Sequence, residues 1–269
     1  GLRCMFHMMN EARIGVGMAA AMLGMAGYEA SLAYAKQRPQ GRAIGAAGKD
    51  AAQPQVPIIQ HADVKRMLLA QKAYAEGALA LQLYCALLVD EQHSGDDANA
   101  REAELLLDVL TPIAKSWPSE WCLEGNSLAI QVHGGYGYTR DFPVEQYWRD
   151  QRLNMIHEGT HGIQALDLLG RKVTMEGGAG LKLLASRISA TIQRAGHVSG
   201  LATAANALAT ALQSLGAAVR ISNGTPPVSA ATRAPVSKWR ALPTLVHSET
   251  ATVGKPRKRP SIAAATVPE

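Results

Sequence analysis

The sequence has few cysteines, few aromatic residues and no long apolar run, and each shortage argues against a class of protein. Its three cysteines, Cys4, Cys85 and Cys122, lie far apart, with no CxxC pair and no histidine at metal-ligand spacing. Neither a disulfide framework nor a metal site is indicated. No apolar run approaches the ~20 residues that cross a bilayer, and the first residues lack the order of a signal peptide. We therefore expect no metal, no membrane contact and a cytoplasmic location.

The distribution of charge argues against nucleic acid as the partner of most of the chain. The 269 residues are 47% hydrophobic, which is enough for one sizeable core or two, and carry a net charge of +5. The excess lies at the C-terminus, because residues 216–269 hold eight basic and two acidic residues, whereas residues 1–215 hold 19 and 20. The body is therefore not a basic surface of the kind that binds an acidic polymer.

Helical periodicity dominates the first two thirds of the chain. Apolar residues recur at helical spacing over residues 5–36, 60–92 and 100–132, and strand signals are nearly absent. Shorter helices are expected after Pro143 and from Thr160 onward. This pattern predicts an all-α fold, an up-and-down four-helix bundle.

The first long helix contains four glycines, which is unusual for a stable helix. Gly15, Gly17, Gly24 and Gly27 each cost about 0.5 to 1 kcal/mol relative to alanine in a helix interior. Such a cost needs compensation. We expect close approach of neighbouring helices to supply it.

The composition divides the chain into three predicted parts: a bundle over residues 1–173, a helical extension over 174–215 and a tail over 216–269. The tail contains seven of the thirteen prolines and is predicted to be a disordered, basic segment. A reading-frame change in the gene is the alternative explanation for its abrupt composition. Its run at 255–260, KPRKRP, is a weak signal for nucleic-acid binding or nuclear import, because such runs are usually only solvated.

The densest unusual stretch is residues 131–164. Three glycines within four residues, Gly134, Gly135 and Gly137, free the backbone to approach a ligand closely, and a phosphate-bearing cofactor would suit such a loop. A glycine that simply ends a helix before a loop is the equal alternative. The nucleotide fingerprint GxGxxG is not present in its usual setting, since no strand precedes the loop.

Several motifs in this stretch resemble the C-terminal signature of the acyl-CoA dehydrogenase family. They are QVHGGYGY at 131–138, PVE at 143–145, RD at 149–150 and IHEGTHGIQ at 156–164. A second region agrees with the family's first C-terminal helix and its arginine loop, with MNEARIGVG at 9–17 and YAKQRPQGR at 34–42. The arginine loop and the helical extension look most like the larger bacterial members. The resemblance covers roughly residues 5–215.

The resemblance implies an FAD enzyme that oxidises an acyl-CoA thioester to the 2-enoyl-CoA. Glu158 matches the family's catalytic base, which removes the proton alpha to the thioester carbonyl while hydride passes to the flavin N5. Judged from its position alone, Glu158 is better explained as an ordinary polar residue before a helix capped by Thr160. His157 and His161, on either side of it, need no catalytic role.

The same resemblance implies a set of binding residues. Those that match the family's cofactor contacts, with the first two reaching across a subunit interface, are Arg38, Gln60, Gln131, Gly134, Gly135, Thr160 and Gln164. Arg13 and Gly159 match positions beside the substrate and the base. The alternatives are a solvated loop charge for Arg38, a helix N-terminal polar residue for Gln60 and a surface ion pair with Glu11 for Arg13.

Nothing in the sequence matches the family's N-terminal helical domain and middle β-barrel, so a C-terminal fragment is expected. Three functions follow: a dehydrogenase or its catalytic-base half, a non-catalytic helical oligomerisation fragment, and a nucleic-acid-binding flavoprotein relative. The first implies acyl-CoA as substrate, electron-transferring flavoprotein as electron acceptor and a homo-oligomer, a dimer or tetramer.

Overall fold

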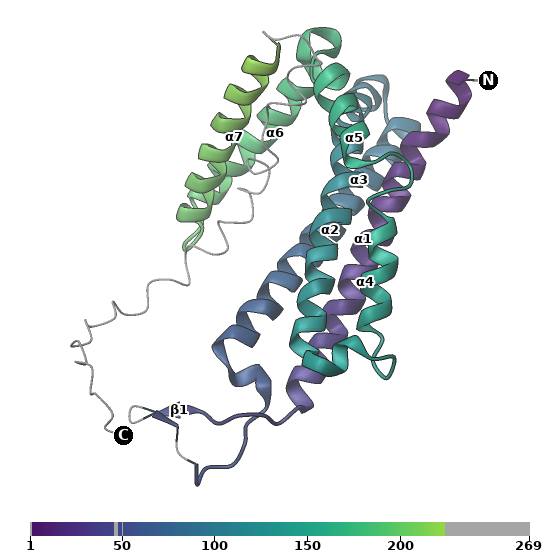
Figure 1. Ribbon diagram of the computed structural model, residues 1–269. Coiled ribbons are helices and arrows are strands. Elements are labelled where there is room, and N and C mark those ends of the chain that lie inside the picture. Colours follow the sequence, from purple (N-terminus) through teal and green to yellow (C-terminus); the bar gives the residue numbers. More distant parts are fainter. Residues whose placement is uncertain (1, 46–47, 50, 224–269) are drawn as a thin grey trace, which may run out of the picture. The chain divides into compact units, whose positions relative to one another are not determined.

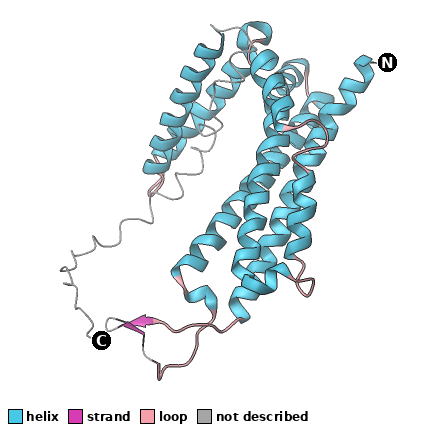
Figure 2. Cartoon of the chain, viewed as in Figure 1, coloured by secondary structure: helices cyan, strands magenta, loops and turns pink. Residues whose placement is uncertain are grey.

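The computed structural model describes residues 2–45, 48–49 and 51–223, and they confirm the predicted all-α bundle (Figures 1 and 2). Three long helices, α1 (Leu2–Gln37), α2 (Ala62–Ser94) and α3 (Asp97–His133), lie against one another. The shorter α4 (Val144–Leu153) packs on α1 and α3 and completes the up-and-down bundle.

The remaining described elements are short or belong to the C-terminal extension. They are α5 (His161–Asp167), a π-helix (Leu168–Lys172), α6 (Ala179–Gly196), α7 (Ala202–Asn223), and 3-10 helices at Ile58–Gln60, Gly134–Tyr138 and Met175–Gly178. Two strands of two residues each, β1 (Ile44–Gly45) and β2 (Gly48–Lys49), pair antiparallel in the loop between α1 and α2. Ile44 lies opposite Lys49, and Gly45 opposite Gly48.

Local chemistry sets both ends of α3. At its start the Asp96 carboxylate accepts a hydrogen bond from the backbone N–H of Asn99 at 2.9 Å, as expected for an N-cap aspartate. At its end Gly134 adopts φ +63°, a conformation that glycine adopts without steric cost, and the chain leaves the helix there. The glycine loop is therefore fixed to the C-terminal end of α3.

Three of the four α1 glycines lie where neighbouring helices approach closely. A Cβ atom on Gly17 would lie 2.1 Å from the carbonyl oxygen of Ala114, one on Gly24 would lie 2.7 Å from the Cβ of Cys122, and one on Gly27 would lie 1.9 Å from the Asn126 Oδ1. The expected compensation is confirmed for these three. Gly15 is exposed and a Cβ there would meet nothing within 4 Å, so the expectation is wrong for this residue.

A buried glutamine compensates for a proline inside α3. Pro118 has no N–H to donate to the carbonyl of Ala114, four residues earlier, so that oxygen loses its helical partner. The side chain of Gln82 on α2 supplies the missing donor, with its Nε2 atom 2.7 Å from the Ala114 oxygen. The side chains of Gln82 and Ala114 are fully buried, so this hydrogen bond joins α2 to α3 in the core.

The C-terminal extension differs from the prediction in two ways. Its single expected helical pattern is broken near Gly200, which has φ +83°, into α6 and α7, which pack against each other. The periodicity was expected to stop near Gly216, but α7 continues to Asn223, because Val219 is buried in a cluster with Val109 of α3. Residues 224–269, including the basic run at 255–260, lie outside the described residues. Within the described part, no helix is both long and apolar enough to cross a membrane.

Candidate active site

Glu158 lies in a turn between α4 and α5 whose backbone is unusual. Glu158 has φ +53° and the next residue, Gly159, has φ +93°. A non-glycine residue in this left-handed region is uncommon and costs of the order of 1 to 3 kcal/mol, so the surrounding structure must hold it. The side chain of Glu158 is only half-buried, which leaves it accessible to a ligand.

Two buried side chains hold the carbonyl groups of this turn. The Nε2 atom of Gln164 donates to the Glu158 carbonyl oxygen at 2.9 Å. The Nζ atom of Lys115, on α3, donates to the Gly159 carbonyl oxygen at 2.7 Å. A Cβ atom on Gly159 would lie 2.6 Å from the Gln164 Nε2, so only glycine allows this approach. The conformation of the turn is therefore fixed from two directions.

Several charges surround the turn. Arg13 of α1 is buried and pairs with Asp167 of α5 at 2.8 Å, and Arg171 pairs with the same carboxylate at 2.7 Å. Burial would raise the pKa of Asp167, but the hydrogen bonds from Arg171 and Arg13 outweigh it and hold that pKa below its usual value. The alternative for Arg13, a surface ion pair with Glu11, does not describe this geometry.

Lys115 carries the most perturbed amine of the site. Burial, together with the neighbouring charge of Arg13, lowers the pKa of Lys115 to about 8, although the carboxylate of Glu158 acts in the opposite direction. His161, at the start of α5, lies 3.4 Å from the Ser119 hydroxyl, and burial, Lys115 and Arg152 lower the pKa of its imidazole. Lys115, next to Arg13, thus brings positive charge to the turn that carries Glu158.

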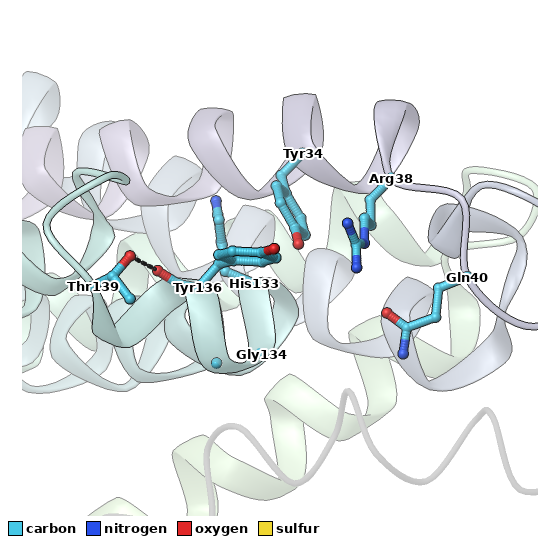
Figure 3. Close-up of a pocket in the computed structure, with 8 residues that line it drawn as sticks. Tyr34, Arg38, Gln40, His133, Gly134, Tyr136 and Thr139 are labelled. Atoms are coloured by element: carbon cyan, nitrogen blue, oxygen red, sulfur yellow. Dashed lines mark hydrogen bonds between the residues drawn. The ribbon is translucent and has the colours of Figure 1, made fainter.

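A second group of predicted residues lines a surface pocket of about 390 Å³ at the C-terminal ends of α1 and α3. Figure 3 labels the lining residues Tyr34, Arg38, Gln40, His133, Gly134, Tyr136 and Thr139. Gly135 also lines the pocket. Its walls are aromatic, because Tyr34 stacks on His133 with ring centroids 4.3 Å apart. The guanidinium of Arg38 lies over the ring of Tyr136, 5.5 Å from its centroid.

The pocket has the chemistry of an anion site. The Arg38 Nε atom is buried and has no hydrogen-bond partner among the described residues, so a donor is left for a ligand. Added Cβ atoms on Gly134 and Gly135 would meet nothing within 4 Å, so the backbone of both residues borders open space. A guanidinium with a free donor beside an open glycine backbone fits a phosphate or pyrophosphate group, as FAD carries.

The other predicted residues fall around these two places. Gln131 is exposed and lines a neighbouring pocket that shares Gly134 with the first. Gln60 is exposed at the end of the 3-10 helix Ile58–Gln60 and lines neither pocket. Thr160 is the N-cap of α5 and is exposed, and its side chain makes no capping hydrogen bond. Gln164 is buried and its amide nitrogen is already engaged in the Glu158 turn.

The two groups do not form one compact site within a chain. Lys115 contacts the Glu158 turn, and Gly134 borders the pocket. Lys115 and Gly134 are 19 residues apart along α3, which corresponds to about 28 Å at about 1.5 Å per residue. The sequence motifs place all these residues in one family signature, but the fold separates them along the bundle.

Sequence reasoning missed Lys115, although the sequence contains a signal for it. Lys115 follows Leu107 and Thr111 at helical spacing of four residues and so lies on the buried face of α3. A lysine on a core-facing stripe is rare unless its ammonium has a partner. The sequence could not identify that partner, the Gly159 carbonyl, which lies 44 residues away.

Comparison with known proteins identifies the class to which this fold and site belong. The family model described as the acyl-CoA dehydrogenase C-terminal domain matches residues 1–173. The chain therefore belongs to the acyl-CoA dehydrogenase family.

Two curated relatives show how much of such a protein the chain represents. It is 41% identical over 191 residues to 3-methylmercaptopropionyl-CoA dehydrogenase of Ruegeria pomeroyi, which covers 71% of this chain and 32% of that protein. It is 38% identical over 192 residues to a broad-specificity linear acyl-CoA dehydrogenase of Mycobacterium tuberculosis, and this match covers 70% of this chain and 31% of that protein. The chain thus spans about a third of the length of these relatives.

Solved structures agree with this assignment. Butyryl-CoA dehydrogenase from Megasphaera elsdenii matches with a TM-score of 0.50 and 25% identity, over 63% of this chain and 38% of that one. Caenorhabditis elegans ACDH-11, solved in complex with C11-CoA, matches with a TM-score of 0.69 and 20% identity, over 81% of this chain and 34% of that one. The second match concerns the fold alone.

Proposed function

We propose that this chain carries the catalytic-base side of an FAD-dependent dehydrogenase that converts an acyl-CoA thioester to its 2-enoyl-CoA. The observation that carries the proposal is the turn of Glu158, which sits in the family motif and whose backbone is held by Lys115 and Gln164. The named relatives act on 3-methylmercaptopropionyl-CoA and on linear acyl-CoA, so an acyl-CoA thioester is the proposed substrate class.

Glu158 is proposed to remove the proton alpha to the thioester carbonyl. Its half-buried carboxylate is accessible to a ligand, while its backbone is fixed, and a fixed backbone restricts the direction from which the carboxylate approaches the substrate. Bound acyl-CoA would exclude water from this side chain. FAD, when bound, supplies the acceptor for the beta hydrogen as hydride.

The pocket beside Arg38 is proposed to hold the phosphate-bearing part of FAD. The unpartnered Nε atom of Arg38 supplies a donor, and the open backbone at Gly134 and Gly135 supplies the space. Gln131 borders the neighbouring pocket, and Gln60 and Thr160 are exposed and available as further contacts. Arg13 and Gly159 remain the residues proposed nearest to the substrate.

The separation of the two groups supports a site made from two copies. The pocket and the Glu158 turn of one chain lie at different positions along the bundle axis. An FAD whose phosphates are bound at Arg38 of one copy is therefore proposed to complete the active site at the Glu158 turn of a second copy. A homo-oligomer, a dimer or tetramer, is therefore the proposed assembly, and electron-transferring flavoprotein is the proposed electron acceptor.

The test is an anaerobic absorbance spectrum of the purified chain reconstituted with FAD, before and after addition of a panel of acyl-CoA thioesters. The proposal expects the oxidised flavin band to bleach, and expects Glu158→Gln to abolish the bleaching while FAD still binds. Bleaching that survives in Glu158→Gln would show that another group is the base.

A non-catalytic role in helical assembly is the second candidate. It is favoured by the large apolar side chains exposed along α2, where Leu69, Leu83 and Leu87 are more than half exposed. Stable oligomers that bind no FAD would support this candidate. Support for the nucleic-acid alternative rests on residues 255–260, outside the described part of the chain.

A further inference from the structure

Lys115 differs from the other lysines of the bundle in having a fully buried side chain with a backbone carbonyl as its hydrogen-bond partner. It is 0% exposed, and its Nζ atom lies 2.7 Å from the carbonyl oxygen of Gly159. Lys172, the other buried lysine among the described residues, pairs instead with the carboxylate of Asp108. A buried ammonium without an adjacent salt-bridge partner is costly, so its position in the fold calls for a reason.

We propose that Lys115 is a positioning residue for the base, and that its ammonium fixes the Glu158–Gly159 turn. The inference rests on the proposed role of Glu158. It adds a residue that no motif of the chain assigns, acting through Glu158 and without contact to the reacting atoms.

The geometry supports this role. Glu158 and Gly159 both have positive φ, and a strained non-glycine conformation relaxes unless its surroundings hold it. Gln164 holds the carbonyl of Glu158 from α5, on one side of the turn, and Lys115 holds the carbonyl of Gly159 from α3. A charge-assisted hydrogen bond is the stronger kind, and α3 is a rigid 37-residue element of the bundle core.

The charges around Lys115 agree with its place beside the turn. The groups that face Lys115 are Arg13 from α1, Glu158 from the turn and His161 from α5. Arg13 lowers the pKa of Lys115 and Glu158 raises it, so the ammonium and the carboxylate of Glu158 attract each other.

The first test measures the turn in the full chain without flavin or substrate. Hydrogen–deuterium exchange of residues 155–164 is compared in the wild type, Lys115→Met, Lys115→Gln and Lys172→Met. Lys115→Met, which has neither charge nor donor, is expected to speed exchange by about tenfold to a hundredfold. Lys115→Gln, which keeps a donor, is expected to lie between it and the wild type. Lys172→Met removes a buried cation elsewhere and is expected to leave this segment unchanged. Equal acceleration in Lys172→Met and Lys115→Met would overturn the positioning role.

The second test measures the charge coupling and does not require a Lys115 variant to fold. The NMR titration of the Lys115 side chain is followed in the wild type, in Glu158→Gln and in Glu120→Gln. The titration is expected to move to lower pH in Glu158→Gln, because the attracting carboxylate is gone. It is expected to stay in place in Glu120→Gln, which removes a carboxylate near His161 that does not act on Lys115. An unchanged titration in Glu158→Gln would contradict the coupling.

The third test connects the turn to the chemistry. If the chain reduces flavin, Lys115→Met is expected to slow the reduction rate constant by about tenfold to a hundredfold, with the dissociation constant for acyl-CoA unchanged. A weakened acyl-CoA affinity with an unchanged rate would assign Lys115 to substrate binding and overturn the proposal. The first two tests need no activity, so they decide the role of Lys115 even where the proposed dehydrogenation fails.

Discussion

Arg13 and Asp167 form an ion pair at 2.8 Å although 154 residues separate them in the sequence. Both side chains are nearly buried, and the pair joins the start of α1 to the end of α5. It therefore anchors the short helix that follows Glu158 to the bundle. The family motif at residues 9–17 thus contacts the chain three residues after the motif at 156–164.

Removal of Arg13 is expected to destabilise the fold. Arg13→Met leaves the buried carboxylate of Asp167 with Arg171 alone, and we expect the free energy of unfolding to fall by about 3 kcal/mol. Arg171→Met is the matched control, because its guanidinium is exposed and an exposed pair contributes less than about 1 kcal/mol. Urea denaturation at pH 7 measures both. Equal losses in the two variants would contradict the idea that Arg13 is the anchor.

The same pair makes stability depend on pH in the acid range. The pKa of Asp167 is lowered from the usual 3.8, so its contribution to stability is present above pH 3.8 and disappears as the pH falls through the lowered value. The deficit of Arg13→Met relative to the wild type is therefore expected to shrink below pH 3.8. Denaturation midpoints of both proteins between pH 2 and pH 6 test this. A deficit that is constant over this range would show that Asp167 does not carry the effect.

Gly159 is expected to tolerate no side chain. Gly159→Ala places a Cβ atom 2.6 Å from the Gln164 Nε2 at a residue whose φ is +93°, so both contact and backbone oppose it. We expect a loss of about 1 to 3 kcal/mol of stability, together with slower flavin reduction. Gly162→Ala is the control, since its Cβ would meet no atom closer than 4.0 Å and its φ is not positive. Thermal denaturation of both variants gives the comparison, and an equal loss in Gly162→Ala would remove the steric explanation.

The protein is expected to become more stable as the pH rises above 8, because Lys115 then loses its proton in the folded state. The pKa of Lys115 is lowered from 10.5 to about 8 in the folded state, so below pH 8 both states are protonated and the fold bears the cost of a buried ammonium. Between pH 8 and pH 10.5 the unfolded chain holds the proton and the folded chain does not, and stability rises by up to about 3 kcal/mol.

The contribution of Lys115 is isolated by the difference in the free energy of unfolding between the wild type and Lys115→Met. Urea denaturation from pH 7 to pH 10 measures this difference. Tyrosines and other lysines titrate in both proteins and cancel in the difference. A difference that does not change with pH would mean that the Lys115 ammonium is solvated.

The sequence predicted the bundle because long helices with a continuous apolar pattern are a local signal. It also singled out Glu158 and the glycine loop as candidates, since both lie inside contiguous motifs. It could not predict that Gln82 donates to the carbonyl left without a partner by Pro118, or that Lys115 reaches Gly159. These contacts join different helices and depend on how the helices are rotated about their axes. The end of α7 was misplaced for a related reason, because Val219 is held by tertiary burial in a segment of weak periodicity.

The glycines of α1 give the sharpest test of this difference between local and tertiary signals. By sequence Gly15 and Gly17 are equivalent, two residues apart in one helix. In the structure Gly15 faces open space, so Gly15→Ala is expected to gain about 0.5 to 1 kcal/mol of stability from helix propensity. Gly17→Ala would place a Cβ 2.1 Å from the Ala114 oxygen and 2.5 Å from the Gln82 Nε2, so α1 must move away from α2 and α3. We expect it to lose about 1 to 3 kcal/mol despite the same gain in propensity. Opposite shifts of the urea midpoint are the predicted result, and a stabilising Gly17→Ala would show that α1 packs less closely than described.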